Sequence, residues 1–192
     1  MSGSRAALPA AELARTVVFA AFIGVLGIFP GVYVGGSAVP IVLQNMGPLL
    51  TGGILGARRG VAAVVLFLAL TAIGLPLLSG GRGGIGAFIG PSGGFILGWI
   101  LSALVVGLIV ARVRPKLPML LVATLAGILV DYAIGIPWLG VYTGDLGAAA
   151  VSSLVFVPGD IAKAVVAALV AAVVHRALPG TLLGTREESQ AP

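Results

Sequence analysis

The chain contains no cysteine, a single histidine and few charged residues, since Asp, Glu, Lys and Arg make up only 9% of its 192 residues. Without cysteine it forms neither disulfides nor thiolate metal sites, and one histidine without clustered acids makes no metal site. Soluble domains carry about 25% charged residues, so the scarcity of charge excludes that class. Together with 59% hydrophobic residues, it predicts an all-α integral membrane protein with a single transmembrane domain and no separate soluble domain.

Six apolar runs are candidates for transmembrane helices. They cover about residues 13–29, 46–57, 60–75, 91–111, 117–136 and 158–178. An upright helix needs about 20 apolar residues to cross a bilayer, so the second run is short, and residues 39–45 are placed to complete it in a non-helical form. Glycines repeat every four residues over 52–60 and 86–98, a spacing that predicts close helix packing. The apolar segment 146–157 is open to interpretation as a re-entrant piece or a helix on the membrane surface.

The basic residues indicate how these runs are oriented. If the N-terminus is cytoplasmic and each run crosses once, nine of the eleven Lys and Arg residues lie on the cytoplasmic side. These nine are Arg5, Arg15, Arg58, Arg59, Arg112, Arg114, Lys116, Arg176 and Arg186. The bias favours six transmembrane helices with both termini cytoplasmic, about residues 12–178 in the membrane, and tails at 1–11 and 179–192. It also explains the net charge of +5 without a nucleic acid partner.

Arg82 and Lys163 are the two basic residues that this topology places on the outer side. The outer loops are rich in Gly, Pro and aromatic residues, which is typical of loops that cover a cavity. Lys163 follows Asp160 by three residues, just after Pro158, so both charges lie on one face at the start of a helix. Charges within an apolar run are functional candidates by default. The alternative is an internal ion pair that only fixes helix packing.

Three further polar positions are candidates. Gln44 and Asn45 precede the short second run, where their amides either bind a polar ligand or satisfy free backbone groups. Asp131 is the one acid near the middle of an apolar run, and both a proton or cation relay and a structural carboxylate bonded to another helix remain open. We expect Asp131 and Asp160 to lie at opposite depths, which argues against an enzyme. Without a GxxxxGK[ST] motif, we do not expect ATP hydrolysis by this chain.

The polar residues expected on the outer side suggest the chemistry of a ligand. They mix donors and acceptors with nearby aromatic residues, which suits a small molecule with an amide-like part, an apolar part and an acid. Arg82 or Lys163 would meet the acid, and Asp160 would accept N–H bonds.

Three motifs, in this order and spacing, resemble those of a known family. They are VPIVLQNMG at 39–47, GLPLLSGGRGGIGAFIGPSGGF at 74–95 and FVPGDIAK at 156–163. Together they are similar to the BioY family, the biotin-binding S components of energy-coupling-factor (ECF) vitamin transporters. The resemblance covers about residues 14–178.

This resemblance implies a multi-pass plasma-membrane protein with the six-helix S-component fold, which binds biotin near the outer surface and needs no cofactor. Its partners would be a transmembrane T component and two ATPase subunits, with Ala10 and Ala14 at the AxxxA spacing used for docking. An S component for a thiamine- or riboflavin-like vitamin is the alternative. On the family pattern, the biotin-binding residues are Asp160, Lys163, Gln44, Arg82, Ser79 and Phe88. We expect Asp160 and Lys163 to meet different parts of biotin rather than to pair with each other.

Overall fold

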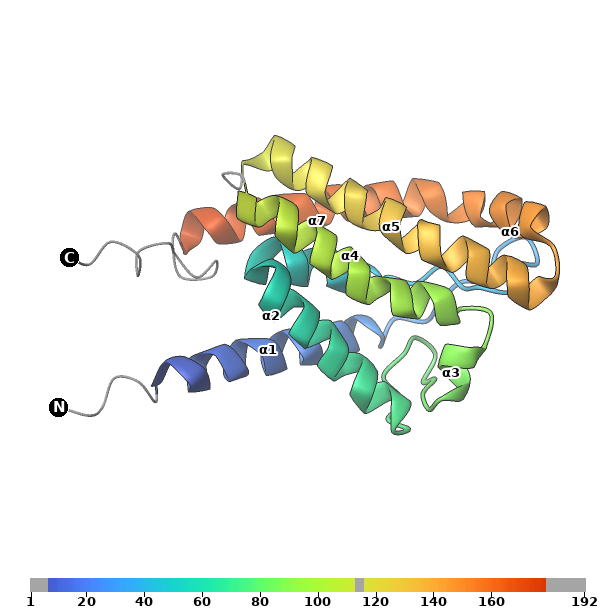
Figure 1. Ribbon diagram of the computed structural model, residues 1–192, viewed down its shortest axis with the longest axis horizontal. Helices are drawn as coiled ribbons and strands as arrows, with labels where there is room; N and C mark the ends of the chain where they lie inside the picture. The colour runs from blue at the N-terminus through green and yellow to red at the C-terminus, as the bar shows by residue number, and fades with distance from the viewer. Residues whose placement is uncertain (1–6, 113–115, 179–192) are drawn as a thin grey trace.

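The computed structural model describes residues 7–112 and 116–178, with side chains from residue 10 onward, and this part of the chain is mostly helical. The helices are α1 (Ala7–Leu26), α2 (Met46–Ala72), α3 (Gly86–Ile89), α4 (Gly93–Arg112), α5 (Leu117–Thr143), α6 (Leu146–Ser153), the 3-10 turn η1 (Leu154–Phe156) and α7 (Val157–Ala177). They form an elongated bundle (Figure 1). At one end of it α1 and α5 begin and α4 and α7 end. Helices α3 and α6 lie toward the other end. The predicted all-α class is therefore confirmed.

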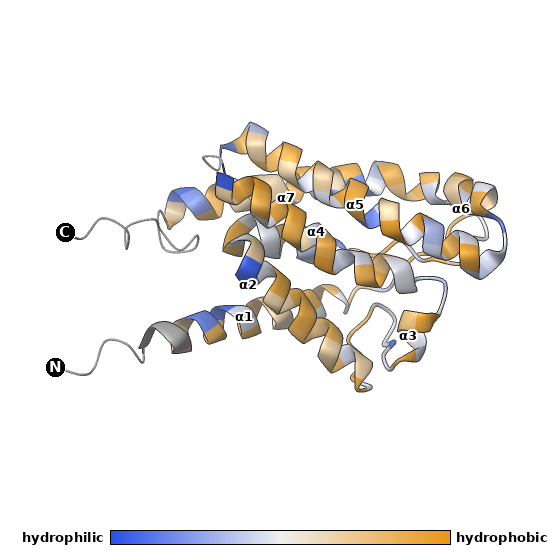
Figure 2. Ribbon diagram, viewed as in Figure 1, coloured by the Kyte–Doolittle hydropathy of each residue, from blue (hydrophilic) through white to orange (hydrophobic). Residues whose placement is uncertain are grey.

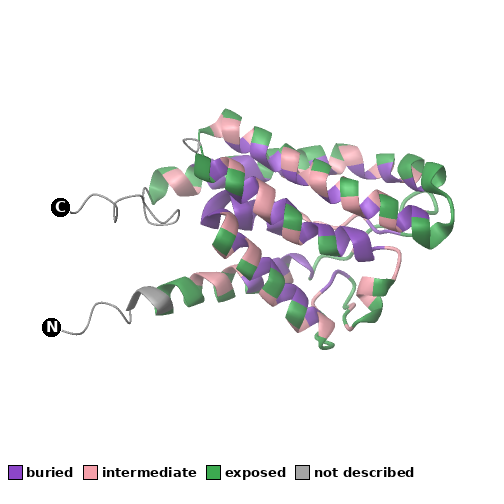
Figure 3. Cartoon of the chain, viewed as in Figure 1, coloured by how far each residue is buried: buried purple, intermediate pink, exposed green. Residues whose placement is uncertain are grey.

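Four helical stretches in the described part of the chain are long and apolar enough to cross a membrane. They are Met46–Ala72, Gly93–Arg112, Leu117–Thr143 and Leu146–Ala177. The apolar residues continue around much of each helix, as Figure 2 shows. Buried residues lie on the faces that meet other helices, and many apolar residues remain exposed on the outside (Figure 3). An apolar exterior of this kind is what a helix needs to contact lipid.

Helix α2 contains both the second and the third predicted run, separated by a break at Gly56. Gly56 has φ 78° and ψ 179°, a backbone conformation that glycine adopts readily and other residues avoid. Beyond the break the chain turns back along the first half of α2. Gly60 packs there so closely that a Cβ added to it would lie 2.8 Å from the Thr51 carbonyl oxygen. The two halves of α2 therefore pack against each other.

Most of the segment 137–157, which lies between the fifth and sixth predicted runs, is helical. Helix α5 continues through Pro137 to Thr143, and α6 and η1 lead directly into α7. Proline removes one helical hydrogen bond, but tight packing on α4 holds this part of α5 in place. Gly94 lies against Trp138, whose Nε1 donates a hydrogen bond to the Gly90 carbonyl at 2.9 Å. Close packing at the predicted glycine spacing is confirmed for Gly94, though not for Gly86, which has open space around it.

Two long loops complete the fold. The first loop (residues 27–45) doubles back on itself through a bridge between Val32 and Ile41, with N–H···O distances of 2.9 and 2.8 Å. The second loop (residues 73–92) contains α3 and a bridge between Leu78 and Arg82. A small apolar cluster holds the end of the first loop inside the bundle. Its buried members are Val39, Phe95, Leu139, Ala149 and Phe156, from the first loop, α4, α5, α6 and η1.

Candidate functional site

A cavity of about 50 Å³ lies where the first loop meets α4, α5 and α7. Its wall contains both apolar and charged side chains, including the two basic residues that the topology prediction placed on the outer side. The lining residues are Val39, Pro40, Ile41, Val42, Gln44, Asn45, Leu78, Arg82, Ser92, Phe95, Ile96, Trp99, Asp131, Tyr132, Phe156, Asp160 and Lys163. The three sequence motifs therefore meet around one cavity.

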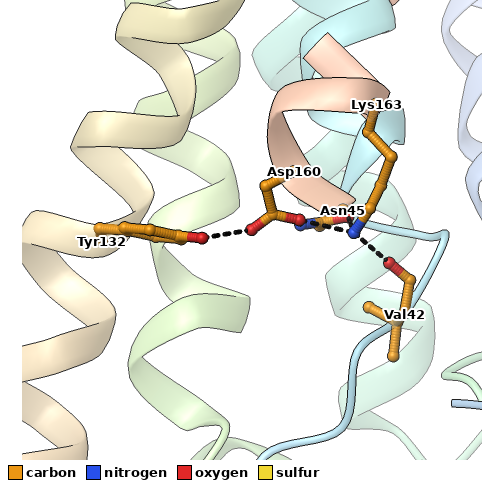
Figure 4. Close-up of polar contacts among 5 residues, drawn as sticks. All are labelled: Val42, Asn45, Tyr132, Asp160 and Lys163. Carbon is orange, nitrogen blue, oxygen red and sulfur yellow. Dashed lines mark hydrogen bonds and ion pairs between the residues drawn. The ribbon is translucent and has the colours of Figure 1, made fainter. Parts of the chain in front are cut away.

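Asp160 and Lys163 form an ion pair at the start of α7. Lys163 Nζ lies 2.5 Å from Asp160 Oδ1, and the two side chains are only 11% and 3% exposed. Lys163 also donates hydrogen bonds to the Val42 carbonyl at 2.8 Å and to Asn45 Oδ1 at 2.9 Å (Figure 4). The expectation that these two charges do not pair with each other is therefore wrong for this structure. A short helical spacing and a buried setting bring them together.

The Asp160 carboxylate is also bonded to two neutral side chains. Asn45 Nδ2 donates to Oδ1 at 2.9 Å, and the Tyr132 hydroxyl donates to Oδ2 at 2.7 Å (Figure 4). Both carboxylate oxygens thus have partners, and these partners come from the first loop, α5 and α7. Such a network compensates the loss of hydration that burial of a charge causes.

Gln44 has a different role from the other polar residues of the wall. It is 1% exposed, and its Nε2 donates to the carbonyls of Ile23 at 3.0 Å and Leu77 at 2.8 Å. Its Oε1 accepts a hydrogen bond from the Ser79 backbone N–H at 3.1 Å. Both amide donors are therefore used by backbone groups of α1 and the second loop. Of the two alternatives for this amide, the contacts favour the one in which it satisfies free backbone groups.

The second loop contributes Arg82 to the cavity, but neither Ser79 nor Phe88 lines it. Arg82 Nε donates to the Ser79 carbonyl at 3.2 Å, and its terminal guanidinium nitrogens bond to none of the described residues, so they can bind a ligand. Ser79 is buried behind the wall and supports Gln44 and Arg82 through its backbone. Phe88, on α3, packs against the apolar cluster around Phe67 and Trp99.

Comparison with known proteins agrees with this arrangement of motifs. The sequence model of the BioY family matches residues 2–180 of the chain. The chain belongs to the BioY family. It is 46% identical over 180 residues to the biotin transporter BioY of Rhodobacter capsulatus, a match covering 86% of this chain and 94% of the relative. It is 44% identical over 167 residues to the biotin transporter BioY of Rhizobium etli, covering 82% and 89%.

A solved structure of another protein has the same fold. The crystal structure of the S component for biotin from an ECF-type ABC transporter superposes with a TM-score of 0.85 at 33% identity, covering 91% of this chain and 95% of that chain. The predicted resemblance is thus confirmed, and this BioY chain has the S-component fold.

Sequence reasoning did not select several residues of the BioY cavity as site residues. Asn45 and Tyr132 bond directly to the ion pair, and Phe95, Trp99 and Phe156 supply the aromatic wall. Asn45 lies inside the first motif and was a candidate from the sequence, although the family pattern did not include it among the biotin-binding residues. The others lie on helices whose rotation and contacts the motifs do not specify, so only the packed bundle shows which of their faces meet the cavity.

Asp131 also lines the BioY cavity, so the expectation that it lies at the opposite depth from Asp160 is wrong. Its side chain is buried, with 6% exposure for the residue, and its Oδ1 accepts no hydrogen bond among the described residues. For this atom, the structural alternative of a carboxylate bonded to a polar neighbour on another helix therefore finds no support. The described residues contain no group of three or more His, Cys, Asp or Glu that could hold a metal ion.

Proposed function

We propose that this BioY chain binds biotin in the cavity and acts in its uptake as the S component of an ECF-type transporter. The observation that carries the proposal is the buried ion pair of Asp160 and Lys163 at a cavity that also receives Arg82. Buried charges are expensive in a membrane bundle unless a ligand or a partner uses them. Relatives covering most of this chain are biotin transporters, which favours biotin over other vitamins as the ligand.

The lining residues match the parts of biotin, which has a cyclic urea, an apolar thioether ring with an alkyl chain, and a carboxylate. Arg82 binds the carboxylate, because no acid of the described residues forms an ion pair with it and a guanidinium suits a carboxylate. Lys163 and Asn45 donate to the urea carbonyl, and Asp160 accepts a urea N–H. The apolar and aromatic wall packs on the ring and the chain.

Binding requires the cavity to expand. A volume of about 50 Å³ holds roughly four water molecules at about 10–15 Å³ of probe space each, which is less than a biotin molecule needs. The first loop is the element able to move, since Asn45 and the Val42 carbonyl reach the ion pair from a long non-helical segment. We infer that biotin displaces part of this loop and takes over hydrogen bonds that the loop now makes with Lys163 and Asp160.

The membrane arrangement that fits these observations has six crossings in a single domain, with both termini cytoplasmic. The reversal at Gly56 turns α2 into two crossings, and α1 begins at the same end of the bundle where α7 ends (Figure 1). Basic residues at the adjacent helix ends and turns support this side as cytoplasmic, in the plasma membrane. Six of the basic residues invoked for it lie in the described part: Arg15, Arg58, Arg59, Arg112, Lys116 and Arg176. Arg5, Arg114, Arg186 and the tail at 179–192 lie outside the described residues.

Energy for uptake comes from partners rather than from this chain. We infer a T component and two ATPase subunits, because the relative with the same fold belongs to an ECF-type ABC transporter. Ala10 and Ala14 are exposed on α1, which leaves this small-residue face open to a transmembrane partner.

Calorimetry on purified, detergent-solubilised protein tests the ligand. We expect tight binding of biotin at about 1:1, and no displacement of biotin by thiamine or riboflavin at comparable concentrations. Protein that is helical and monodisperse but does not bind biotin contradicts the proposal. Tighter binding of thiamine or riboflavin than of biotin would assign the cavity to the alternative vitamins.

A further inference from the structure

Three buried side-chain atoms in the described part of the chain lack hydrogen-bond partners. They are Ser79 Oγ, Ser92 Oγ and Asp131 Oδ1. Ser92 and Asp131 both line the cavity, whereas Ser79 does not. Buried polar groups are normally satisfied, so an exception requires a reason. Two exceptions at one cavity indicate that the missing hydrogen bonds are made by a molecule that enters it.

Asp131 is held in place between α5 and α4. Its Oδ1 lies directly against Gly98, so close that a Cβ added to Gly98 would overlap this oxygen. The absence of a side chain at position 98 therefore makes the space that the carboxyl occupies. Because Oδ1 is buried, bulk water does not supply its hydrogen bond. A donor has to reach it through the cavity.

The neighbouring donor groups of the cavity do not bond to this oxygen. Lys163, from α7, is committed to Asp160, Asn45 and the Val42 carbonyl. The Tyr132 hydroxyl, next along α5, donates to Asp160.

Arg82, from the second loop, lines the cavity but makes no hydrogen bond to Asp131, whose Oδ1 has no partner among the described residues. The cavity-lining residues of α4 and the first loop carry no charge. Both oxygens of the Asp160 carboxylate thus have hydrogen-bond partners, whereas Oδ1 of Asp131 has no partner among the described residues.

We propose that Asp131 is a second ligand-binding carboxyl group, which accepts a hydrogen bond from an N–H of the ligand. The inference rests on the proposed function, because a cyclic urea such as that of biotin presents two N–H donors on opposite sides of one carbonyl. Asp160 and Asp131 then take one N–H each, and Lys163 stays near the carbonyl between them. Asp131 makes the cavity selective for ligands that carry both donors, since an unmet buried acceptor penalises a ligand without them.

Calorimetric affinities for biotin and for a biotin methylated on its urea nitrogens test this role. The variants are Asp131→Val, which removes the acceptor, and Asp131→Asn, which retains a carbonyl acceptor of the same shape. Thr124→Val is the matched control. Thr124 is buried on the same helix seven residues earlier and does not line the cavity. If Asp131→Val does not fold, Asp131→Ala replaces it.

We expect Asp131→Val to bind biotin about 10- to 100-fold more weakly, and Asp131→Asn and Thr124→Val to stay within about threefold of the unsubstituted chain. Methylation of both urea nitrogens should weaken binding to the unsubstituted chain more than binding to Asp131→Val, because the variant has only the contact with Asp160 left to lose. A folded Asp131→Val protein that binds both ligands like the unsubstituted chain overturns the inference and leaves biotin binding intact. Failure of the unsubstituted chain itself to bind biotin overturns the proposed function.

Discussion

The hydroxyl of Tyr132 donates a hydrogen bond to Asp160 Oδ2 at 2.7 Å across a sequence separation of 28 residues. This bond joins α5 to the start of α7 and fixes one side of the carboxylate, while Lys163 and Asn45 bond to the other oxygen. The ion pair therefore does not depend on α7 alone. It is held by a network whose parts can be removed one at a time.

Removing the tyrosine hydroxyl tests the importance of this network. We expect Tyr132→Phe to lower the free energy of unfolding by about 1.5–3 kcal/mol, because a buried charged acceptor loses a donor. We also expect weaker biotin binding, because Asp160 is no longer held in one orientation. Thermal unfolding and calorimetry measure the two effects. Tyr142→Phe is the control, since Tyr142 is 56% exposed near the end of α5, and an equal effect of both substitutions argues against a specific role for Tyr132.

Breaking the ion pair should affect both stability and binding. Asp160→Asn and Lys163→Met each leave one buried charge without its partner, which typically costs about 3–5 kcal/mol. We expect each single variant to lose biotin binding and to unfold at a lower temperature. The double variant should recover much of the stability, since no charge is left unpaired, yet remain unable to bind biotin. Recovery of binding together with stability would mean that the pair only fixes helix packing.

Gln44 and Asn45 are adjacent but should respond differently to substitution. Gln44→Ala removes three hydrogen bonds to backbone groups, so we expect a loss of roughly 2–4 kcal/mol in the free energy of unfolding. Asn45→Ala removes contacts to the ion pair, so biotin affinity should fall more than stability. Thermal melts and binding isotherms of both variants separate these outcomes. A reversed pattern would assign ligand binding to Gln44.

The role of Arg82 can be tested by changing the ligand rather than the protein alone. We expect Arg82→Ala to weaken biotin binding about 10- to 100-fold, through loss of a charge-assisted bond to the carboxylate. The same variant should bind biotinamide, which has no carboxylate, about as well as the unsubstituted chain does. Competition calorimetry with both ligands gives the comparison. Equal losses for biotin and biotinamide would place the ligand carboxylate elsewhere.

Gly56 should be intolerant of substitution because of its backbone conformation. At φ 78° and ψ 179°, an alanine is strained by about 1–3 kcal/mol, and the reversal within α2 depends on this residue. We expect Gly56→Ala to reduce the folded yield and the melting temperature. Gly86→Ala is the matched control, since Gly86 is helical and has nothing within 4 Å of an added Cβ. Fluorescence-detected size exclusion of both variants measures the yield.

Much of this protein was predictable from local sequence. Apolar runs can satisfy their backbone only as helices in lipid, so composition alone determined the membrane class and the approximate helices. The motifs around Asp160, Gln44 and Arg82 identified the family, because their order and spacing resemble the family pattern. The match of the family model to residues 2–180 confirms this. The sequence predicted two adjacent runs on either side of the break near Gly56. It did not predict that the chain reverses direction tightly there.

Tertiary structure decided the rest of the site. Which face of α5 meets the cavity depends on glycine-mediated contacts with α4, so the shared location of Asp131 and Asp160 does not follow from their positions in the sequence. The helical course of α5 through Pro137 likewise depends on Trp138 and its neighbours. The pairing of Asp160 with Lys163 needs burial together with Asn45 and Tyr132, because exposed charges three residues apart attract each other only weakly in water. Local sequence thus supplied the charged groups, and packing determined their partners.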